Sequence, residues 1–354
     1  MQTLIVGGGL SGLALAERLQ AEGEDYHLLE ARDRFGGRIM TERPGDGYFD
    51  MGPAWFWPGQ PRIEALAARF GLRVFAQHAV GDLMFEDEAG RVGRGLGFAS
   101  MAGSRRLEGG LAALTEALQA RLPLARKQLN AQVTGLQMSK GICRAALADG
   151  GAIEADRVVL AMPPRLAGGL DFCPALPASA LRAMAGVPTW MAGQAKAVAV
   201  YGRPFWREAG LSGDAMSRRG PMVEIHDASP VDGQCAALFG FIGVPPAARA
   251  DEQALRRAIV AQLGLLFGDE ATTPHALYLK DWAFDPMTAT AADATPQHVH
   301  PAYGLPAALE DLWNGHLTLA GTEVAATYGG YIEGALEAAE AALARLTARE
   351  PALR

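Results

Sequence analysis

Hydrophobic and polar residues along the N-terminal part of the chain alternate in a pattern that predicts a strand, a helix and a second strand. Thr3 to Val6 is a short apolar and β-branched run, as in a buried parallel strand. Leu13 to Glu22 has the apolar spacing of a helix, and Gly23 ends it. Tyr26 to Leu29 is a second apolar strand, closed by Glu30. This order predicts a Rossmann-like α/β unit.

The same patterns continue to the C-terminus. Further predicted strands are 128–136, 142–147, 156–161, 195–201 and 317–319, and predicted helices run from 107 to 121 and from 331 to 349. The second of these helices is rich in alanine, carries charges, and is expected to be a surface or docking helix. We predict a discontinuous Rossmann-like α/β domain of residues 1–75, 105–165 and 295–354. Residues 76–104 and 166–294 are predicted to form a second, α+β domain.

Composition narrows the class of protein. The chain has 354 residues, 49% apolar and 20% charged, which suits two globular domains. A net charge of -7 disfavours nucleic acids and anionic membranes as partners. The spacing of the three cysteines, Cys143, Cys173 and Cys235, indicates neither a disulfide framework nor a metal site, which suits a cytoplasmic protein. The histidines also lack the spacing of metal ligands, so we expect no metal site. No membrane-spanning or targeting segment is evident.

The glycine-rich turn after the first strand has the GxGxxG spacing of a dinucleotide site. Gly7 allows the tight turn, Gly9 lets a pyrophosphate approach the backbone, and Gly12 lets helix and strand pack closely. The helix that follows offers free N–H groups to phosphates. Glu30 lies 18 residues after Gly12 and can accept hydrogen bonds from ribose hydroxyls.

The segment from Glu30 to Arg38, E-A-x-x-x-x-G-G-R, resembles the FAD site of the flavin-containing amine oxidase superfamily. The resemblance implies that Arg38 lies near the pyrophosphate and that the loop through Gly37 passes close to FAD. The cofactor site is then expected to include Ala31 and Arg32. Asp50-Met51-Gly52 is similar to the family's D-x-G, which places Gly52 beside the isoalloxazine; the aromatic residues 55–57 after it could equally be core residues.

Two segments of the middle of the chain extend this resemblance. The strand ending at Ala161 is similar to the family's return strand, which places Val133 against the adenine. Lys196 lies in an otherwise apolar strand, where a charge can also protect a sheet edge from aggregation. However, K-x-x-x-x-Y-x-x-P-F-W-R closely resembles the family strand whose lysine contacts flavin N5 through a water. Trp282 occupies the place of a tryptophan that lies beside the flavin in relatives.

The C-terminal segment carries the most specific resemblance. Residues 320–323 are A-G-T-E and residues 330–335 are G-Y-I-E-G-A, as in the family. This implies that Gly321 and Glu323 contact FAD, and that the helix near Ile332 points its positive end at the flavin. Tyr331 matches a tyrosine of the family's aromatic cage, although a core tyrosine is the alternative.

Three departures from the family pattern also follow from the sequence. No cysteine lies between Cys235 and the C-terminus, so the flavin is expected to be bound non-covalently. The second cage tyrosine would fall near Ala291-Ala292. Only 48 residues separate Gln60 from Gly109, where larger relatives carry a helical part of the substrate domain.

The resemblance implies an FAD-dependent oxidoreductase. It would oxidise an amine by hydride transfer to flavin N5, with Lys196, Tyr331 and Trp282 at the reaction centre and O2 as acceptor, giving an imine and hydrogen peroxide. A flavin desaturase and a renalase-like oxidase of reduced nicotinamides are alternatives. A flavin-binding protein without turnover is a third.

Overall fold

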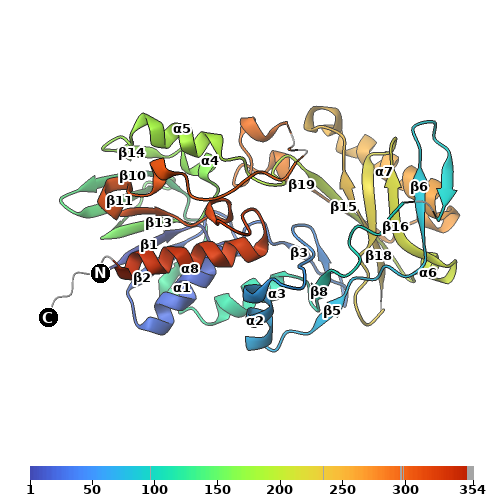
Figure 1. Ribbon diagram of the computed structural model, residues 1–354, viewed down its shortest axis with the longest axis horizontal. Helices are drawn as coiled ribbons and strands as arrows, with labels where there is room; N and C mark the ends of the chain where they lie inside the picture. The colour runs from blue at the N-terminus through green and yellow to red at the C-terminus, as the bar shows by residue number, and fades with distance from the viewer. Residues whose placement is uncertain (96, 234, 296, 298, 349–354) are drawn as a thin grey trace.

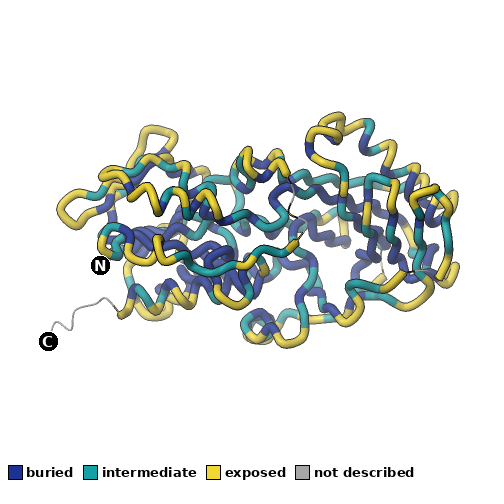
Figure 2. Tube along the Cα trace, turned by 45° about the horizontal axis from the view of Figure 1, so that its top comes forward, coloured by how far each residue is buried: buried dark blue, intermediate teal, exposed yellow. Residues whose placement is uncertain are grey.

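The structure is a computed structural model that describes residues 1–348 apart from 96, 234, 296 and 298. Its elements form two units at opposite ends of an elongated molecule (Figure 1). One unit contains the N-terminus, β1 (Thr3–Val6) and α8 (Ile332–Ala348), and the other contains a large, mostly antiparallel sheet. Buried residues concentrate in the strands of both units, whereas the turns at the two ends are exposed (Figure 2).

A five-stranded parallel sheet is the centre of the first unit. Its order is β20-β13-β1-β2-β9, and every neighbouring pair is parallel. Besides β1, its strands are β2 (Tyr26–Leu29), β9 (Lys127–Gln128), β13 (Arg157–Leu160) and β20 (Leu317–Leu319). Parallel strands are buried on both faces, which explains their continuous apolar runs.

The two faces of this sheet are covered differently. Ile5, Leu28 and Val159 face helices, whereas Leu4 and Val158 face a second, four-stranded sheet. The helices on the first face are α1 (Leu10–Glu22), α2 (Pro61–Arg69), α3 (Ala112–Ala120) and α8. The second sheet has the order β12-β11-β10-β14 and is accompanied by two short helices. Its elements are β10 (Val133–Ser139), β11 (Ile142–Leu147), β12 (Ala152–Ala155), β14 (Asp171–Cys173), α4 (Pro164–Ala167) and α5 (Ala178–Gly186).

The second unit is a seven-stranded sheet of order β19-β15-β18-β17-β16-β6-β7. Its strands are β6 (Asp82–Glu86), β7 (Val92–Arg94), β15 (Ala195–Tyr201), β16 (Leu211–Ser217), β17 (Met222–Asp227), β18 (Ala236–Ile242) and β19 (Ala276–Asp281). Only β6 and β16, among these neighbours, pair in parallel. The helices α6 (Phe205–Glu208) and α7 (Glu252–Phe267) pack on one face. The other face turns toward the first unit, where Val198 and Val200 contact Phe49 and Met51.

Two short strand pairs lie in the chain between these sheets. β3 (Thr41–Glu42) pairs with β4 (Phe49–Asp50), and β5 (Val74–Ala76) pairs with β8 (Arg105–Leu107). The C-terminal end of β4 is important for the site, because the D-x-G segment begins there and lies at the junction between the units.

Most predicted elements agree with the structure, and three differ. Helix α1 begins at Leu10, three residues before the predicted start, because Gly9 already takes the N-cap position. The predicted strand 128–136 is interrupted between β9 and β10, where Asn130 has a φ of 55°. The predicted helix 107–121 begins only at Ala112, because Leu107 is the last residue of β8. The predicted surface or docking helix agrees with the structure, since it packs its alanine-rich side on α1 and leaves Glu340 exposed.

Residues 166–186 also pack differently from our prediction. β14 pairs with β10, and α5 packs beside the same four-stranded sheet through Ala180 and Met184. We therefore place the boundary between the units near residue 187 rather than at 166, since the segment before it shares the hydrophobic core of the first unit.

Candidate active site

The glycine turn between β1 and α1 leaves an open crevice at Gly9. A Cβ atom at Gly12 would lie 1.9 Å from the Gly7 carbonyl oxygen, and one at Gly7 would lie 2.4 Å from the Ala161 carbonyl oxygen. At Gly9, in contrast, the nearest atom would be the Gly37 Cα at 3.9 Å. No side chain caps the N-terminus of α1. Free N–H groups at the N-terminus of a helix, reached through an open backbone, fit a pyrophosphate.

The carboxylate of Glu30 is buried beside this turn. It accepts hydrogen bonds from the Gly8 N–H at 2.8 Å and the Arg32 N–H at 2.9 Å. The guanidinium of Arg32 points to another segment and donates to Asp285 Oδ1 at 2.8 Å and to Thr288. Glu30 therefore holds the turn in shape, and it lies where a ribose could also donate to it.

Replacement of Glu30 by alanine is expected to weaken FAD binding by about 10- to 100-fold, the effect of losing a charge-assisted hydrogen bond. The affinity is measured by titrating apo-protein with FAD and following flavin fluorescence. Asp33→Ala is the control, because that carboxylate is exposed three residues further along the same turn. Equal FAD affinities of wild type and Glu30→Ala would show that Glu30 does not bind the ribose.

A second buried carboxylate belongs to Glu323 in the turn after β20. Its side chain is fully buried and lies 2.6 Å from Arg38 Nη1 in an ion pair, yet neither of its oxygens accepts a well-directed hydrogen bond. A buried carboxylate normally satisfies its hydrogen-bonding capacity. The free capacity of Glu323 fits a ligand that supplies hydroxyl or N–H donors, such as the ribityl chain of FAD.

The predicted cofactor residues lie along one continuous path. Gly37 contacts Gly9, and the Arg38 carbonyl oxygen would lie 1.9 Å from a Cβ atom at Gly52. Gly52 in turn accepts a hydrogen bond from Lys196. Four segments that are distant in sequence thus meet in one chain of contacts from Gly9 to Lys196. The other predicted residues lie at the following places in the chain: Ala31 next to Glu30, Val133 at the start of β10, and Gly321 two residues before Glu323.

The two units meet at the D-x-G segment, where Lys196 and Trp282 converge. Lys196 is buried, and its Nζ donates to the Gly52 carbonyl oxygen. The Trp282 Nε1 donates to the Met51 carbonyl oxygen over 3.0 Å. Both donors come from the second unit and both acceptors from the first. The backbone of the D-x-G segment is therefore fixed on the side where Lys196 lies.

The environment of Lys196 changes its acid–base behaviour. Burial lowers the pKa of Lys196 to about 7, although the nearby Asp50 carboxylate acts in the opposite direction. Burial raises the pKa of Asp50 to about 6, while Thr41 and the Leu111 N–H donate hydrogen bonds to it. Lys196 can therefore change its charge near neutral pH, which an ordinary surface lysine cannot.

Tyr331 belongs to an aromatic cluster immediately before α8. The residue is 41% exposed, and its ring stacks on the ring of His300, with centroids 4.7 Å apart and an angle of 13°. The edges of Trp190 and Tyr303 meet His300 at 4.8 and 5.4 Å. The family's second cage tyrosine would fall near Ala291-Ala292, where alanines form a 3-10 turn, and His300 stacks on Tyr331 instead. His300 was missed because its place beside Tyr331 arises from packing between segments that are distant in sequence, and because its type differs from the expected tyrosine.

Two glutamates of α8 have roles that the sequence alone did not indicate. Glu333 is fully buried and accepts hydrogen bonds from the Arg62 N–H at 3.0 Å and the Ile63 N–H at 2.9 Å. It thereby caps α2, whose own N-cap residue Gln60 makes no side-chain cap. Glu337 accepts from three successive N–H groups of residues 326–328. These bonds position the loop that carries Tyr331.

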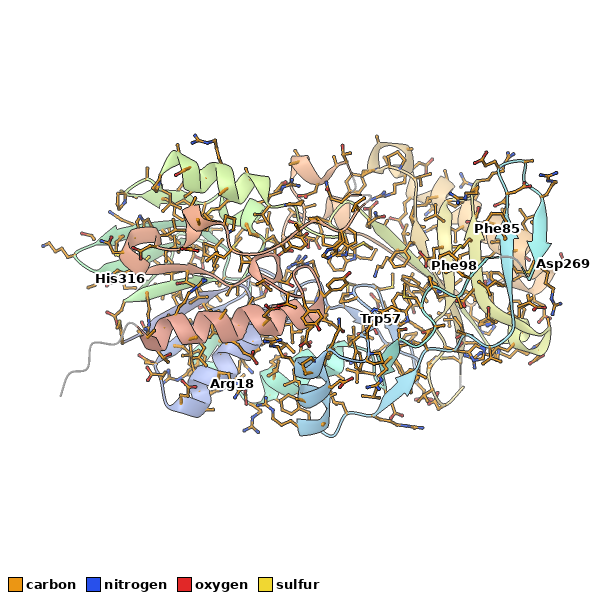
Figure 3. All side chains as sticks on the ribbon, viewed as in Figure 1. Arg18, Trp57, Phe85, Phe98, Asp269 and His316 are labelled. Carbon is orange, nitrogen blue, oxygen red and sulfur yellow. The ribbon has the colours of Figure 1, made fainter. Side chains whose placement is uncertain are left out.

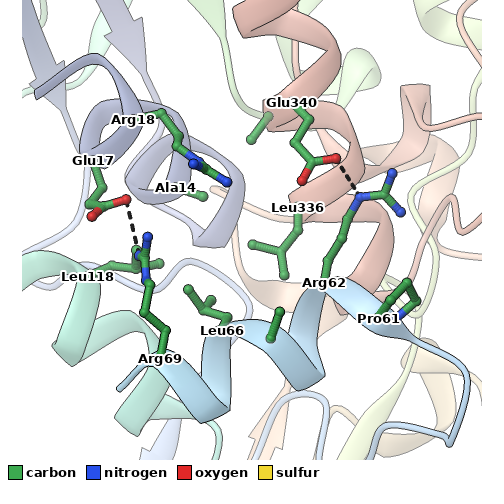
Figure 4. Close-up of a pocket in the computed structure, with 12 residues that line it drawn as sticks. Ala14, Glu17, Arg18, Pro61, Arg62, Leu66, Arg69, Leu118, Leu336 and Glu340 are labelled. Carbon is green, nitrogen blue, oxygen red and sulfur yellow. Dashed lines mark hydrogen bonds and ion pairs between the residues drawn. The ribbon is translucent and has the colours of Figure 1, made fainter. Parts of the chain in front are cut away.

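A groove of about 250 Å³ lies elsewhere, between α1, α2 and α8. Figure 4 shows Arg62 reaching Glu340 and Arg69 reaching Glu17 across it. Neither Lys196 nor Tyr331 lines the groove, so it is separate from the candidate active site.

In the described residues, no His, Cys, Asp or Glu side chains are grouped so as to hold a metal ion. Among the helices that the structure describes, none is long and apolar enough to cross a membrane.

The glycine turn on a parallel sheet, joined to a mostly antiparallel sheet with a buried lysine, is typical of two-unit enzymes that use a dinucleotide cofactor. The chain belongs to the family of flavin containing amine oxidoreductases, whose model matches residues 10–88 and 78–346. It is therefore an FAD-dependent oxidoreductase, and the expected family and fold class are confirmed.

Individual relatives are distant in sequence and similar in fold. The chain is 24% identical over 445 residues to flavin-containing amine oxidase B of Sus scrofa, covering 96% of this chain and 84% of the relative. It is 23% identical to putrescine oxidase of Kocuria rosea, covering 80% and 82%. The solved structure of cyclohexylamine oxidase from Brevibacterium oxydans is 20% identical and has a TM-score of 0.83, covering 99% of both chains.

Proposed function

We propose that the protein oxidises a small amine to an imine and passes the electrons to O2, giving hydrogen peroxide. The observation that carries the proposal is the convergence of Lys196 and Trp282 on the D-x-G segment of the cofactor path. The family supports amine oxidation as the type of reaction. Location in the cytoplasm remains a prediction from the sequence.

The cofactor would be held by residues of the first unit. The pyrophosphate would lie at Gly9 and the N-terminus of α1, the ribose at Glu30, and the ribityl chain at Glu323, which has free acceptor capacity. When bound, FAD would supply the acceptor for the hydride that leaves the α-carbon of the amine.

The side chains at the junction would prepare the substrate and control the charge around it. Lys196 would hold a water molecule and supply a positive charge that depends on pH. Trp282 would keep the D-x-G backbone in place through its bond to Met51. Tyr331, with His300 stacked on it, would present an aromatic surface that orients the uncharged amine.

The proposal is tested by the products of aerobic turnover with a panel of primary amines. We expect hydrogen peroxide, ammonia and the aldehyde from imine hydrolysis in equal amounts. Turnover of an amine without peroxide would mean that another acceptor takes the electrons.

We also expect the FAD to be bound without a covalent link, because the sequence has no cysteine after Cys235. Acid or heat denaturation of the purified protein should release free FAD into the supernatant, where its absorbance and fluorescence are measured. Flavin that stays with the precipitated chain would contradict this expectation.

A further inference from the structure

The face of the seven-stranded sheet that carries Lys196 also carries a carboxylate two strands away. Lys196 on β15 is the register partner of Phe241 on β18, and Phe241 is the partner of Glu224 on β17. Partners in register point to the same face of a sheet, so the three side chains form one row. Two strand spacings separate the Cα atoms of Lys196 and Glu224 by about 10 Å.

Aromatic side chains fill the space between these two groups. The Lys196 Nζ lies 5.1 Å from the ring centre of Phe239 and 5.0 Å from that of Phe241. Trp55 packs against both rings, at 5.1 and 6.2 Å. This residue follows the D-x-G segment, and Figure 3 labels its neighbour Trp57 near the middle of the molecule, between the two units. Phe239 is buried, whereas Phe241 and Trp55 are partly exposed, so these two rings form an apolar, aromatic surface between Lys196 and the carboxylate of Glu224.

Glu224 is held in place and keeps acceptor capacity. Its Oε1 contacts His226 Nε2 at 3.0 Å and accepts a hydrogen bond from the Ser100 hydroxyl, whereas its Oε2 has no hydrogen bond in the described residues. The Glu224 side chain is 28% exposed. His226 is buried, and its Nδ1 contacts Asp214 Oδ1 at 2.7 Å. The edge of the Trp55 ring meets His226 at 5.3 Å, which joins the carboxylates to the aromatic surface.

The charges of this group do not balance. The hydrogen bond from His226 lowers the pKa of Glu224, which keeps it a carboxylate at neutral pH. Burial acts to lower the pKa of His226, but its bonds to Asp214 and Glu224 raise it. No lysine or arginine in the described part of the chain pairs with either carboxylate. Two carboxylates therefore share one imidazole, and one negative charge remains for a cation to neutralise.

We propose that Glu224 binds a second cationic group of the substrate, so that the enzyme prefers diamines to monoamines. The Cα separation suits nitrogens joined by about four to six carbon atoms, since both side chains rise from the same face. The amine that reacts would lie at Lys196 and Tyr331, the carbon chain on the aromatic surface, and the distal ammonium at Glu224 Oε2. This inference rests on the proposed function and names the substrate class of the same site.

The test compares pentane-1,5-diamine with hexylamine, which has similar length and lacks the second charge. Reduction of the bound flavin is followed anaerobically by stopped flow over a range of concentrations, which separates the dissociation constant from the limiting rate. In the wild type we expect tighter binding of the diamine. Glu224→Gln should raise the dissociation constant of the diamine by about 10- to 100-fold and change that of hexylamine by less than about threefold.

Two further variants complete the design. Glu224→Asp keeps the charge and should retain part of the preference, and Glu252→Gln changes an exposed glutamate on α7 and should change nothing. If hexylamine reduces the flavin and Glu224→Gln leaves the diamine constant unchanged, Glu224 is only structural and the inference is wrong while the proposed function stands. The same conclusion follows if Glu224→Gln weakens the binding of both amines equally. If neither of these two amines reduces the flavin, the inference is wrong, and reduction by any other amine of a wider panel would leave the proposed function standing.

Discussion

Lys196→Met is expected to retain FAD and to slow the reaction of the reduced flavin with O2 by at least about tenfold, because a nearby cation stabilises the charge of developing superoxide. The variant keeps the length and apolar stem of the side chain. FAD binding should survive, because the glycine turn, Glu30 and Glu323 lie on other segments. The rate is measured by photoreducing the enzyme and mixing it with O2, which needs no knowledge of the substrate.

The pH dependence of this rate gives a second test. The pKa of Lys196 is lowered to about 7, so the cation is present below this pH and is lost above it. The wild-type rate should therefore fall as the pH rises through about 7, whereas the Met variant should lack this step. Lys140→Met, in an exposed turn, is the control. A Met variant with the wild-type rate would show that Lys196 only serves the structure of its strand.

The same pKa also predicts a change in stability. Because the folded state binds the Lys196 proton less tightly than the unfolded state, this residue makes the free energy of unfolding rise with pH between about 7 and 10.5. The Met variant should lack that contribution. Chemical denaturation of both proteins at several pH values measures the difference.

Gly9→Ala is expected to leave the fold intact and to reduce FAD affinity by about 100-fold or more, equivalent to ~3 kcal/mol of binding energy. Its φ of -72° suits alanine, and the added Cβ atom would have no protein atom nearer than 3.9 Å. The methyl group would instead occupy the crevice through which a pyrophosphate reaches the N–H groups of α1. Thermal unfolding of the apo-protein and FAD titration measure the two effects separately.

Gly12→Ala is the contrasting variant. Its Cβ atom would lie 1.9 Å from the Gly7 carbonyl oxygen, so the apo-protein itself should lose about 1–3 kcal/mol of stability. Gly186→Ala, at a position with open space and no positive φ, should change neither quantity. Wild-type FAD affinity in Gly9→Ala would mean that the pyrophosphate does not approach this backbone.

Local pattern was sufficient to predict the parallel strands and their glycine turn. The strands at 3–6, 26–29 and 195–201 have the bounds that their apolar runs predicted, because a strand buried on both faces admits few polar residues. The helix start at Leu10 was missed because a glycine N-cap has no side-chain signal. The pairing of β14 with β10 was not predicted, because it joins segments that are distant in sequence.

In the candidate site, too, residues within local motifs could be predicted from the sequence, whereas residues placed by long-range packing could not. Motifs predicted Lys196, Glu323 and Tyr331 as site residues, because the roles proposed for them depend on residue type at a fixed spacing. His300 and Glu224 could not be found in this way, because each acquires its place from packing between segments that are distant in sequence. Glu333 was part of a recognised motif, but its cap on α2 joins two ends of the chain.

The central claim is that an amine reduces the flavin of this protein. Anaerobic mixing of the holoenzyme with a panel of monoamines, diamines and reduced nicotinamides tests it most directly, with the flavin absorbance as the signal. We expect at least one amine to bleach the flavin rapidly. The Lys196→Met variant should still bind FAD. Bleaching by reduced nicotinamides and by none of the amines would contradict the account and favour a renalase-like oxidase.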